Sequence, residues 1–180
     1  AEHDDRQARV ALARDRGEAQ NRGLGRLQPA RAELAELRQI AAVLAYCTEH
    51  GIAVVPFGGG TSVVGGLDPI RGQFGSVISL DLRRLDALHW LDETSSEAEL
   101  GAGVTGPQAE ELLGAHGFSL GHFPQSFQFA TIGGFAATRS SGQNSAGYSR
   151  FDDMVRGLTV VTPARPYRTK AVLFATGAQH

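Results

Sequence analysis

The sequence has a single cysteine, Cys47, among its 180 residues. One thiol excludes an intramolecular disulfide and a cysteine metal cluster, and such low cysteine usage is typical of a reducing compartment. Cys47 lies inside a helical pattern, so we expect it to be a small buried apolar residue. The six histidines show no metal-ligand spacing, and we predict no bound metal. Asp152 and Asp153 are adjacent, so their side chains point in different directions, and we expect a helix cap or a salt bridge there.

Long apolar runs are also missing. No stretch approaches the roughly 18 consecutive apolar residues that suggest a transmembrane helix. No signal-peptide pattern of basic, apolar and small residues is present either, so we expect a cytoplasmic protein. The net charge is only −2 and the basic residues are scattered along the chain. We therefore expect no nucleic-acid partner.

Glycine is abundant, with 23 residues against seven prolines, which indicates a loop-rich chain. Hydrophobic residues at 42% and charged residues at 20% are typical of a soluble globular protein. A chain of this length can bury well over half of its unfolded surface. It begins at Ala1 without an initiator Met, and residues 175–180 do not resemble a natural end. We expect a fragment of a longer protein.

Hydrophobic periodicity predicts helices and strands in alternation. Residues 1–26 are rich in Ala and Arg with an apolar focus at 10–13, which favours a short surface helix with frayed ends. A stronger helix begins near Arg31, ends before Gly51, and is followed at once by a strand at 52–55. The apolar face of this helix is formed by Leu34, Leu37, Ala41, Leu44 and Cys47.

The remaining elements follow the same signals. We expect a strand at 76–82, and a hairpin that joins strands at 87–91 and 97–104 through the polar turn 92–96. A capping-box sequence starts a helix at Thr105 and Gly117 ends it. The last two strands are expected at 157–162 and 167–172.

The nine residues 54–62 contain three consecutive glycines after a predicted strand. Three glycines are costly in conformational entropy, and they provide a backbone whose amide groups can converge on an anion. Ligands of open α/β sheets bind at such strand ends, so a diphosphate is the ligand we expect. No Lys follows the last glycine, which excludes a Walker loop, and the run poorly matches G-x-G-x-x-G. A flexible turn would explain this loop alone equally well.

A second region, residues 121–142, is dense in small and hydroxylated residues. Within it, residues 131–134 read Thr-Ile-Gly-Gly, which predicts a hydroxyl and exposed amides where a helix begins. Such a helix start is a second potential anion cradle. Two loops of this kind favour a nucleotide site more strongly than one.

Together these motifs resemble the FAD-binding domain of the vanillyl-alcohol oxidase and p-cresol methylhydroxylase (PCMH) superfamily. Within it they are similar to alkyldihydroxyacetonephosphate synthases and bacterial FAD-linked oxidases. The resemblance rests on residues 56–62, on 121–124 with Ser126 and 131–134, and on 138–142, and it extends through 152–155 to 160–163. It implies an α+β fold, a two-lobed PCMH-type FAD-binding domain, over residues 31–180, preceded by a poorly defined helical segment, 1–30. The last flavin loop and the cap domain of the family are absent, so we expect a truncated domain.

The resemblance also implies the site. The residues expected to bind FAD without a covalent bond are Pro56, Phe57, Gly58, Gly59, Gly60, Thr61, Ser62, Gln125, Ser126, Phe127, Gln128, Phe129, Ala130, Thr131, Gly133, Gly134, Thr138, Arg139, Ser140 and Ser141. The family usually has Asp at the position of Gln125. His122 matches a histidine that lies near the flavin in the synthases, and it is the candidate catalytic residue, with loop packing as the alternative.

The implied function is that of a flavoenzyme fragment. A synthase-like member would exchange the acyl group of a dihydroxyacetone phosphate ester for an alkyl group through a flavin adduct. The alternative within the superfamily is a D-lactate or glycolate dehydrogenase, and an alternative of another class is a non-catalytic nucleotide-binding module. A small-molecule substrate, which can be lipid-like, and a homodimer are the partners we expect. The fragment alone is expected to be inactive.

Overall fold

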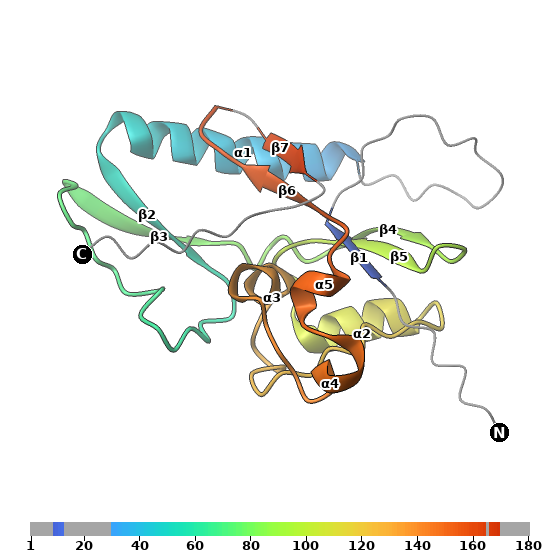
Figure 1. The fold of residues 1–180 in the computed structure, drawn as a ribbon. Helices are drawn as coiled ribbons and strands as arrows, with labels where there is room; N and C mark the ends of the chain where they lie inside the picture. Colours follow the sequence, from blue (N-terminus) through green and yellow to red (C-terminus); the bar gives the residue numbers. More distant parts are fainter. Residues whose placement is uncertain (1–8, 13–29, 165, 170–180) are drawn as a thin grey trace, which may run out of the picture.

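The computed structural model of the protein describes residues 9–12, 30–164 and 166–169. Strands and helices are mixed along these ranges and form an α+β fold with a five-stranded sheet and a two-stranded sheet (Figure 1). The strands are β1 (Arg9–Leu12), β2 (Ile52–Phe57), β3 (Ser76–Asp81), β4 (Leu88–Asp92), β5 (Glu97–Leu100), β6 (Gly157–Val161) and β7 (Pro166–Thr169). The helices are α1 (Ala30–Glu49), α2 (Gly106–Gly114), α3 (Ile132–Thr138), α4 (Ser145–Tyr148) and α5 (Phe151–Met154).

Helix α1 and strand β2 form the unit that leads into the glycine loop, residues 58–62. The predicted helix is confirmed, and Gly51, which follows it, has a φ of 61° that suits glycine. Cys47 is buried, as expected. The α1 helix packs against β2 and also against β6 and β7. The predicted strand at 52–55 is two residues longer and reaches Phe57, so the loop begins directly at the end of the strand.

Strands β2 and β3 pair in parallel, in a register that runs from Ile52 opposite Ser76 to Phe57 opposite Asp81. Both strands therefore end at the same edge. Residues 58–75 connect them without a helix or a strand. This connection starts with the glycine loop, which places the loop at the carboxyl end of a parallel pair, where ligands of such sheets commonly bind.

The predicted hairpin is confirmed, because β4 and β5 pair in antiparallel fashion. Strand β5 stops at Leu100 and does not continue to residue 104 as the sequence suggested. The reason is that the next residues pair with the start of α3. The amides of Ile132 and Gly133 donate to the carbonyl oxygens of Val104 and Ala102, each at 2.8 Å.

The N-terminal prediction is wrong for Arg9–Leu12, which forms a strand and no surface helix. Strand β1 occupies the middle of the five-stranded sheet, in the order β4-β5-β1-β6-β7, and is parallel to both of its neighbours. A four-residue segment carries too little periodicity to separate strand from helix. The strand is favoured because its backbone groups complete the ladders of β5 and β6. The predicted last strand is confirmed up to Thr169, and residues 170–172 lie outside the described part.

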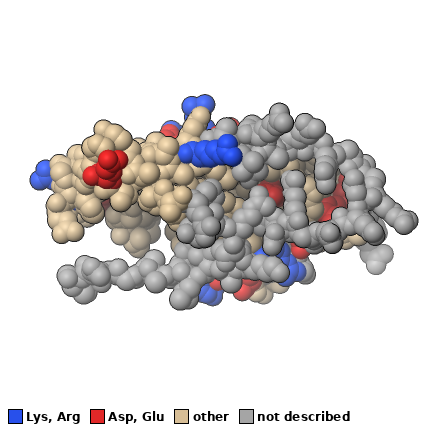
Figure 2. Space-filling model, turned by 90° about the horizontal axis from the view of Figure 1, so that it is seen from above, with Lys and Arg blue, Asp and Glu red and all other residues tan. Residues whose placement is uncertain are grey.

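The core lies where β5, α2, α3 and α5 meet. Its largest fully buried side chains are Leu100, Val104, Leu113, Leu120, Ile132, Phe135 and Phe151. In Figure 1 helices α2 to α5 gather on one side of β4 and β5, away from α1. On the face shown in Figure 2, basic and acidic side chains are scattered among uncharged residues. Within the described ranges no helix is long and apolar enough to cross a membrane.

Candidate FAD-binding site

The glycine loop, residues 58–62, offers backbone donors at the end of β2. Among the described residues, none accepts a hydrogen bond from the amides of Gly58, Gly59, Gly60 or Thr61. Gly60 has a φ of 71°, so the loop turns sharply at a position that a side chain would strain. Successive amides in such a turn form a concave site for an anion. The geometry supports the predicted role in diphosphate binding.

The structure brings this loop into contact with the second predicted motif. A Cβ atom on Gly59 would lie 2.7 Å from Ala130 Cα and would overlap the carbonyl oxygen of Phe129. A Cβ on Gly58 would lie 2.6 Å from Thr131 Oγ1. Gly59 is therefore required by close backbone packing, Gly58 lies against the Thr131 side chain, and Gly60 is required by the turn. The two loops, far apart in the sequence, form one surface.

The start of α3 differs from the expected anion cradle. Thr131 is the N-cap of α3, as predicted, and its Oγ1 accepts from the amide of Gly134 at 3.3 Å. The amides of Ile132 and Gly133 are also occupied, by the backbone of residues 102 and 104. The prediction of exposed amides at 132–134 is wrong, because the segment after β5 accepts from the amides of Ile132 and Gly133, and the Thr131 hydroxyl accepts from the amide of Gly134. This region supports the glycine loop and adds no second set of free donors.

Residues 125–130 form a turn between the two motifs. The amides of Phe129 and Ala130 both donate to the Ser126 carbonyl, at 3.0 and 2.9 Å. Phe129 as a residue is 67% exposed although its backbone packs on Gly59. Phe127 instead packs against Phe123, with ring centroids 5.1 Å apart. Phe129 is thus the aromatic side chain of this turn that is available to a bound molecule.

The predicted residues 138–141 begin at the last residue of α3, about 10 Å from its start for a seven-residue helix. Arg139 donates from Nε to Asp152 Oδ2 at 2.7 Å, and Arg150 lies 3.5 Å from Oδ1 of the same carboxylate. This ion pair confirms the salt bridge expected for the adjacent aspartates. Partial desolvation acts to raise the pKa of Asp152, but the hydrogen bond from Arg139 and the two positive charges outweigh it and lower this pKa.

His122 is only 3% exposed and lies inside an aromatic cluster. Its ring meets Phe135 edge-on at 4.9 Å and Phe151 at 5.1 Å between centroids. Its Nε2 is 3.0 Å from Ser140 Oγ. Burial lowers the pKa of His122, so the ring is neutral near pH 7. This placement suits the loop-packing alternative, and a catalytic role for His122 stays a prediction.

The expected site residues therefore fall into groups. Those at the strand end and loop are Pro56, Phe57, Gly58, Gly59, Gly60, Thr61 and Ser62. Those in the facing turn and the start of α3 are Gln125, Ser126, Phe127, Gln128, Phe129, Ala130, Thr131, Gly133 and Gly134. Those at the far end of α3 are Thr138, Arg139, Ser140 and Ser141. The first two groups are in contact through Gly58 and Gly59, and the third joins the second where the Thr138 hydroxyl donates to the Gly134 carbonyl at 2.8 Å.

Two residues beside the loop were not predicted from the sequence. Arg83 forms an ion pair with Asp81 and lies over the ring of Phe57, with its Cζ 5.3 Å from the ring centroid. The parallel pairing of β2 and β3 brings these residues beside the loop, because it places Phe57 opposite Asp81. That register cannot be read from either strand alone. No group of three or more His, Cys, Asp or Glu side chains in the described ranges could hold a metal ion.

Comparison with known proteins agrees with this geometry. A family described as "FAD binding domain" matches residues 29–165. The chain belongs to this family of FAD-binding domains. The unpaired amides at the glycine loop and the close packing against residues 129–131 fit the diphosphate of FAD, and the residues present are consistent with that cofactor.

Three relatives illustrate the match. The chain is 39% identical over 122 residues to alkyldihydroxyacetonephosphate synthase of Trypanosoma brucei brucei, covering 67% of this chain and 20% of that protein. It is 30% identical over 126 residues to a putative mitochondrial D-lactate dehydrogenase of Schizosaccharomyces pombe, covering 70% and 23%. A solved structure of alkyldihydroxyacetonephosphate synthase matches with a TM-score of 0.70 and 32% identity, over 76% of this chain and 26% of that chain. This chain therefore matches about a fifth to a quarter of the length of these relatives.

Proposed function

We propose that this FAD-binding domain serves an alkyldihydroxyacetonephosphate synthase-like flavoenzyme. Such an enzyme exchanges the acyl group of a dihydroxyacetone phosphate ester for an alkyl group. The observation that carries the proposal is the joined surface of the glycine loop and residues 129–131, in a chain similar to synthases in both sequence and structure. The substrate is then a small, lipid-like molecule.

The residues of the chain have distinct tasks in this proposal. The amides of Gly58, Gly59, Gly60 and Thr61 bind the FAD diphosphate, because they have no acceptor among the described residues. The exposed Phe129 ring covers an apolar part of the cofactor beside that loop. When bound, FAD supplies the chemistry at its isoalloxazine ring. The protein orients the cofactor and keeps water from one of its sides.

A dehydrogenase that acts on a 2-hydroxy acid such as D-lactate or glycolate is the second candidate. It is favoured by the similarity to the S. pombe protein whose name is putative D-lactate dehydrogenase. Both candidates use FAD in the same kind of domain, so the glycine loop has the same task in each.

Flavin loading is the first test. The purified chain titrated with FAD should bind one equivalent and stay yellow after desalting, with the flavin absorption near ~450 nm. A chain that retains adenine nucleotides and stays colourless with FAD would support the non-catalytic nucleotide-binding module.

A segment exchange then separates the two enzymes. In the first hybrid, the aligned segment of the T. brucei synthase is replaced by the matching residues of this chain. In the second hybrid, the aligned segment of the S. pombe protein is replaced in the same way. We expect the first hybrid to form alkyl product from acyl-dihydroxyacetone phosphate and a fatty alcohol at a rate near that of its parent. Flavin content of each hybrid is the control. A first hybrid that is loaded with flavin but inactive, beside a second hybrid that oxidises D-lactate, would contradict the synthase proposal.

Size-exclusion chromatography with light scattering tests the expected homodimer.

A further inference from the structure

The end of β3 carries an ion pair directly beside the glycine loop. Asp81 is the last residue of β3, and its register partner Phe57 is the last residue of β2. The Arg83 Nε atom lies 3.0 Å from Asp81 Oδ1 and 3.1 Å from Oδ2, and Nη2 lies 2.6 Å from Oδ2. Two guanidinium nitrogens thus contact one carboxylate, which fixes the plane of the guanidinium.

This fixed guanidinium lies over the ring of Phe57, with Cζ 5.3 Å from the ring centroid. The ring in turn reaches the loop. Its Cζ and Cε2 atoms lie 3.2 and 3.3 Å from the position that a Cβ on Gly60 would take. Gly60 is the residue at which the loop turns with φ of 71°. A continuous series of contacts therefore runs from Asp81 through Arg83 and Phe57 to Gly60.

The charges of this series are already paired. The hydrogen bond from Arg83 lowers the pKa of Asp81 to about 2, and the carboxylate raises the pKa of Arg83. Both groups are therefore ionised at neutral pH. Because the guanidinium is engaged by Asp81 and the Phe57 ring, its effect on the loop is exerted through the position of that ring.

We propose that Arg83, held by Asp81, is a positioning residue that keeps Phe57 against Gly60 and so maintains the diphosphate-binding turn of the loop. This role goes beyond the proposed reaction, since it concerns FAD affinity in either candidate enzyme. Without Arg83 the ring and the Gly60 turn lose a restraint, and the loop spends less time in the binding-competent conformation. The apparent affinity for FAD falls in proportion to the population of that binding-competent conformation.

The size of the effect is bounded by the interactions involved. Arg83 and Asp81 have side chains that are 59% and 48% exposed, so solvent weakens the pair. An exposed cation–π contact corresponds to a change of about two- to fivefold in an equilibrium constant. We therefore expect Arg83→Met to weaken FAD binding by about two- to fivefold.

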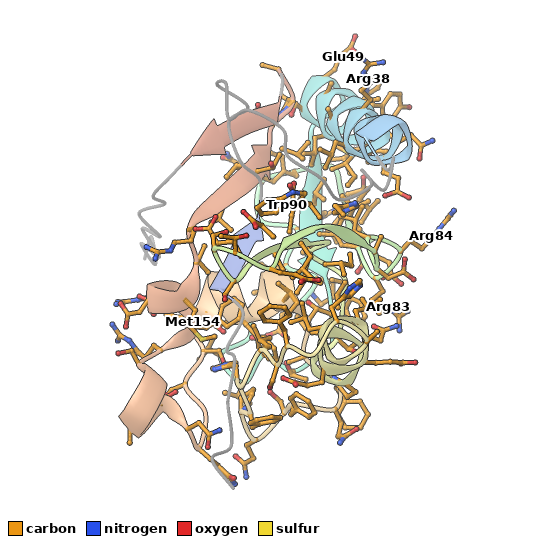
Figure 3. All side chains as sticks on the ribbon, turned by 90° about the vertical axis from the view of Figure 1, so that its right-hand side faces the viewer. Arg38, Glu49, Arg83, Arg84, Trp90 and Met154 are labelled. Carbon is orange, nitrogen blue, oxygen red and sulfur yellow. The ribbon has the colours of Figure 1, made fainter. Side chains whose placement is uncertain are left out.

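The experiment measures FAD dissociation constants of the 180-residue chain by quenching of flavin fluorescence. The variants are Arg83→Met, Arg83→Lys and Asp81→Asn. Arg84→Met is the matched control, because Arg84 is the next residue, carries the same charge and extends away from the ribbon in Figure 3. Thermal unfolding of each variant without FAD shows whether folding is affected. Arg83→Lys keeps a cation near the ring but cannot form the fork with Asp81.

We expect Arg83→Met and Asp81→Asn to weaken binding, Arg83→Lys to be intermediate, and Arg84→Met to bind as the unaltered chain does. The unfolding midpoints without FAD should stay close together, which a purely structural role would not predict. Equal weakening in Arg83→Met and Arg84→Met would overturn the proposal, because loss of any positive charge would then suffice. Unchanged affinity in Arg83→Met would also overturn it. If the unaltered chain itself fails to bind FAD, the function proposed above fails independently of Arg83.

Discussion

Gly59 is the position at which the structure makes its sharpest prediction. A Cβ there would lie 2.7 Å from Ala130 Cα and would overlap the Phe129 carbonyl oxygen. Both neighbours are backbone atoms, so no side-chain rotation can relieve the overlap. Gly59→Ala, the smallest possible change, should push the glycine loop away from residues 129–131. Gly59→Asp adds bulk and a negative charge at the proposed diphosphate site and should abolish flavin retention.

The magnitude follows from the packing. Adding a methyl group to a closely packed site costs about 1–3 kcal/mol. If the loop moves to relieve this cost and must move back to bind FAD, affinity falls by about 5- to 150-fold. Gly58→Ala should have a smaller effect, because the nearest atom is the Thr131 hydroxyl, 2.6 Å from the added carbon, and this side chain can rotate away at the cost of the hydrogen bond it accepts from the Gly134 amide.

The assay is a fluorescence titration with FAD, with circular dichroism and urea unfolding to establish that each variant is folded. Gly114→Ala is the matched control, because a Cβ at this helical glycine would meet nothing within 4 Å. This control should bind FAD normally and be unchanged or slightly more stable, since alanine favours helix. A folded Gly59→Ala chain that binds FAD within twofold of the unaltered chain would refute the contact between the two loops.

Three further predictions concern the cofactor and pH. We expect FAD to be bound without a covalent link, so acid precipitation should release all of the yellow colour, and colour in the pellet would contradict this. The FAD-loaded chain alone should show no flavin bleaching when mixed anaerobically with acyl-dihydroxyacetone phosphate, D-lactate or glycolate. Reaction requires a substrate that is held over the flavin and shielded from water, which we do not expect these residues to achieve alone. Bleaching would place the substrate site within these residues. Because burial lowers the pKa of His122 in the folded chain, the unfolded chain binds the extra proton first, and stability should fall as pH drops below about 6.5. His122→Phe should flatten the slope of the unfolding midpoint between pH 7 and 5, and an unchanged slope would assign the pH dependence to other groups.

The strength of local signals explains which elements could be predicted. Helix α1 has five apolar residues at helical spacing and a glycine at its end, so sequence periodicity was sufficient. The hairpin of β4 and β5 and the N-cap at Thr131 also depend on neighbours in sequence. Strand β1 is different, because Arg9–Leu12 becomes a strand only through β5 and β6, which follow much later in the chain.

The same division applies to the site. The three glycines and the following hydroxyl residues by themselves indicated an anion-binding loop, since few other roles require such a backbone. The sequence could not show that amides 132 and 133 are occupied, because their acceptors lie in the segment after β5. Nor could it show that His122 is buried between Phe135 and Phe151. Each of these facts depends on an acceptor or a ring supplied from a distant position.

The sequence by itself determined the chemistry of the site: a backbone without side chains at a strand end, and the motifs of an FAD-binding domain. Only the tertiary structure decided which backbone touches which. It set the glycine loop on residues 129–131, and it placed Arg83 and Asp81 beside Phe57. The physical reason is that local conformation follows from each residue and its near neighbours. Close packing and hydrogen-bond pairing, in contrast, join segments whose register is fixed only when the whole sheet has formed.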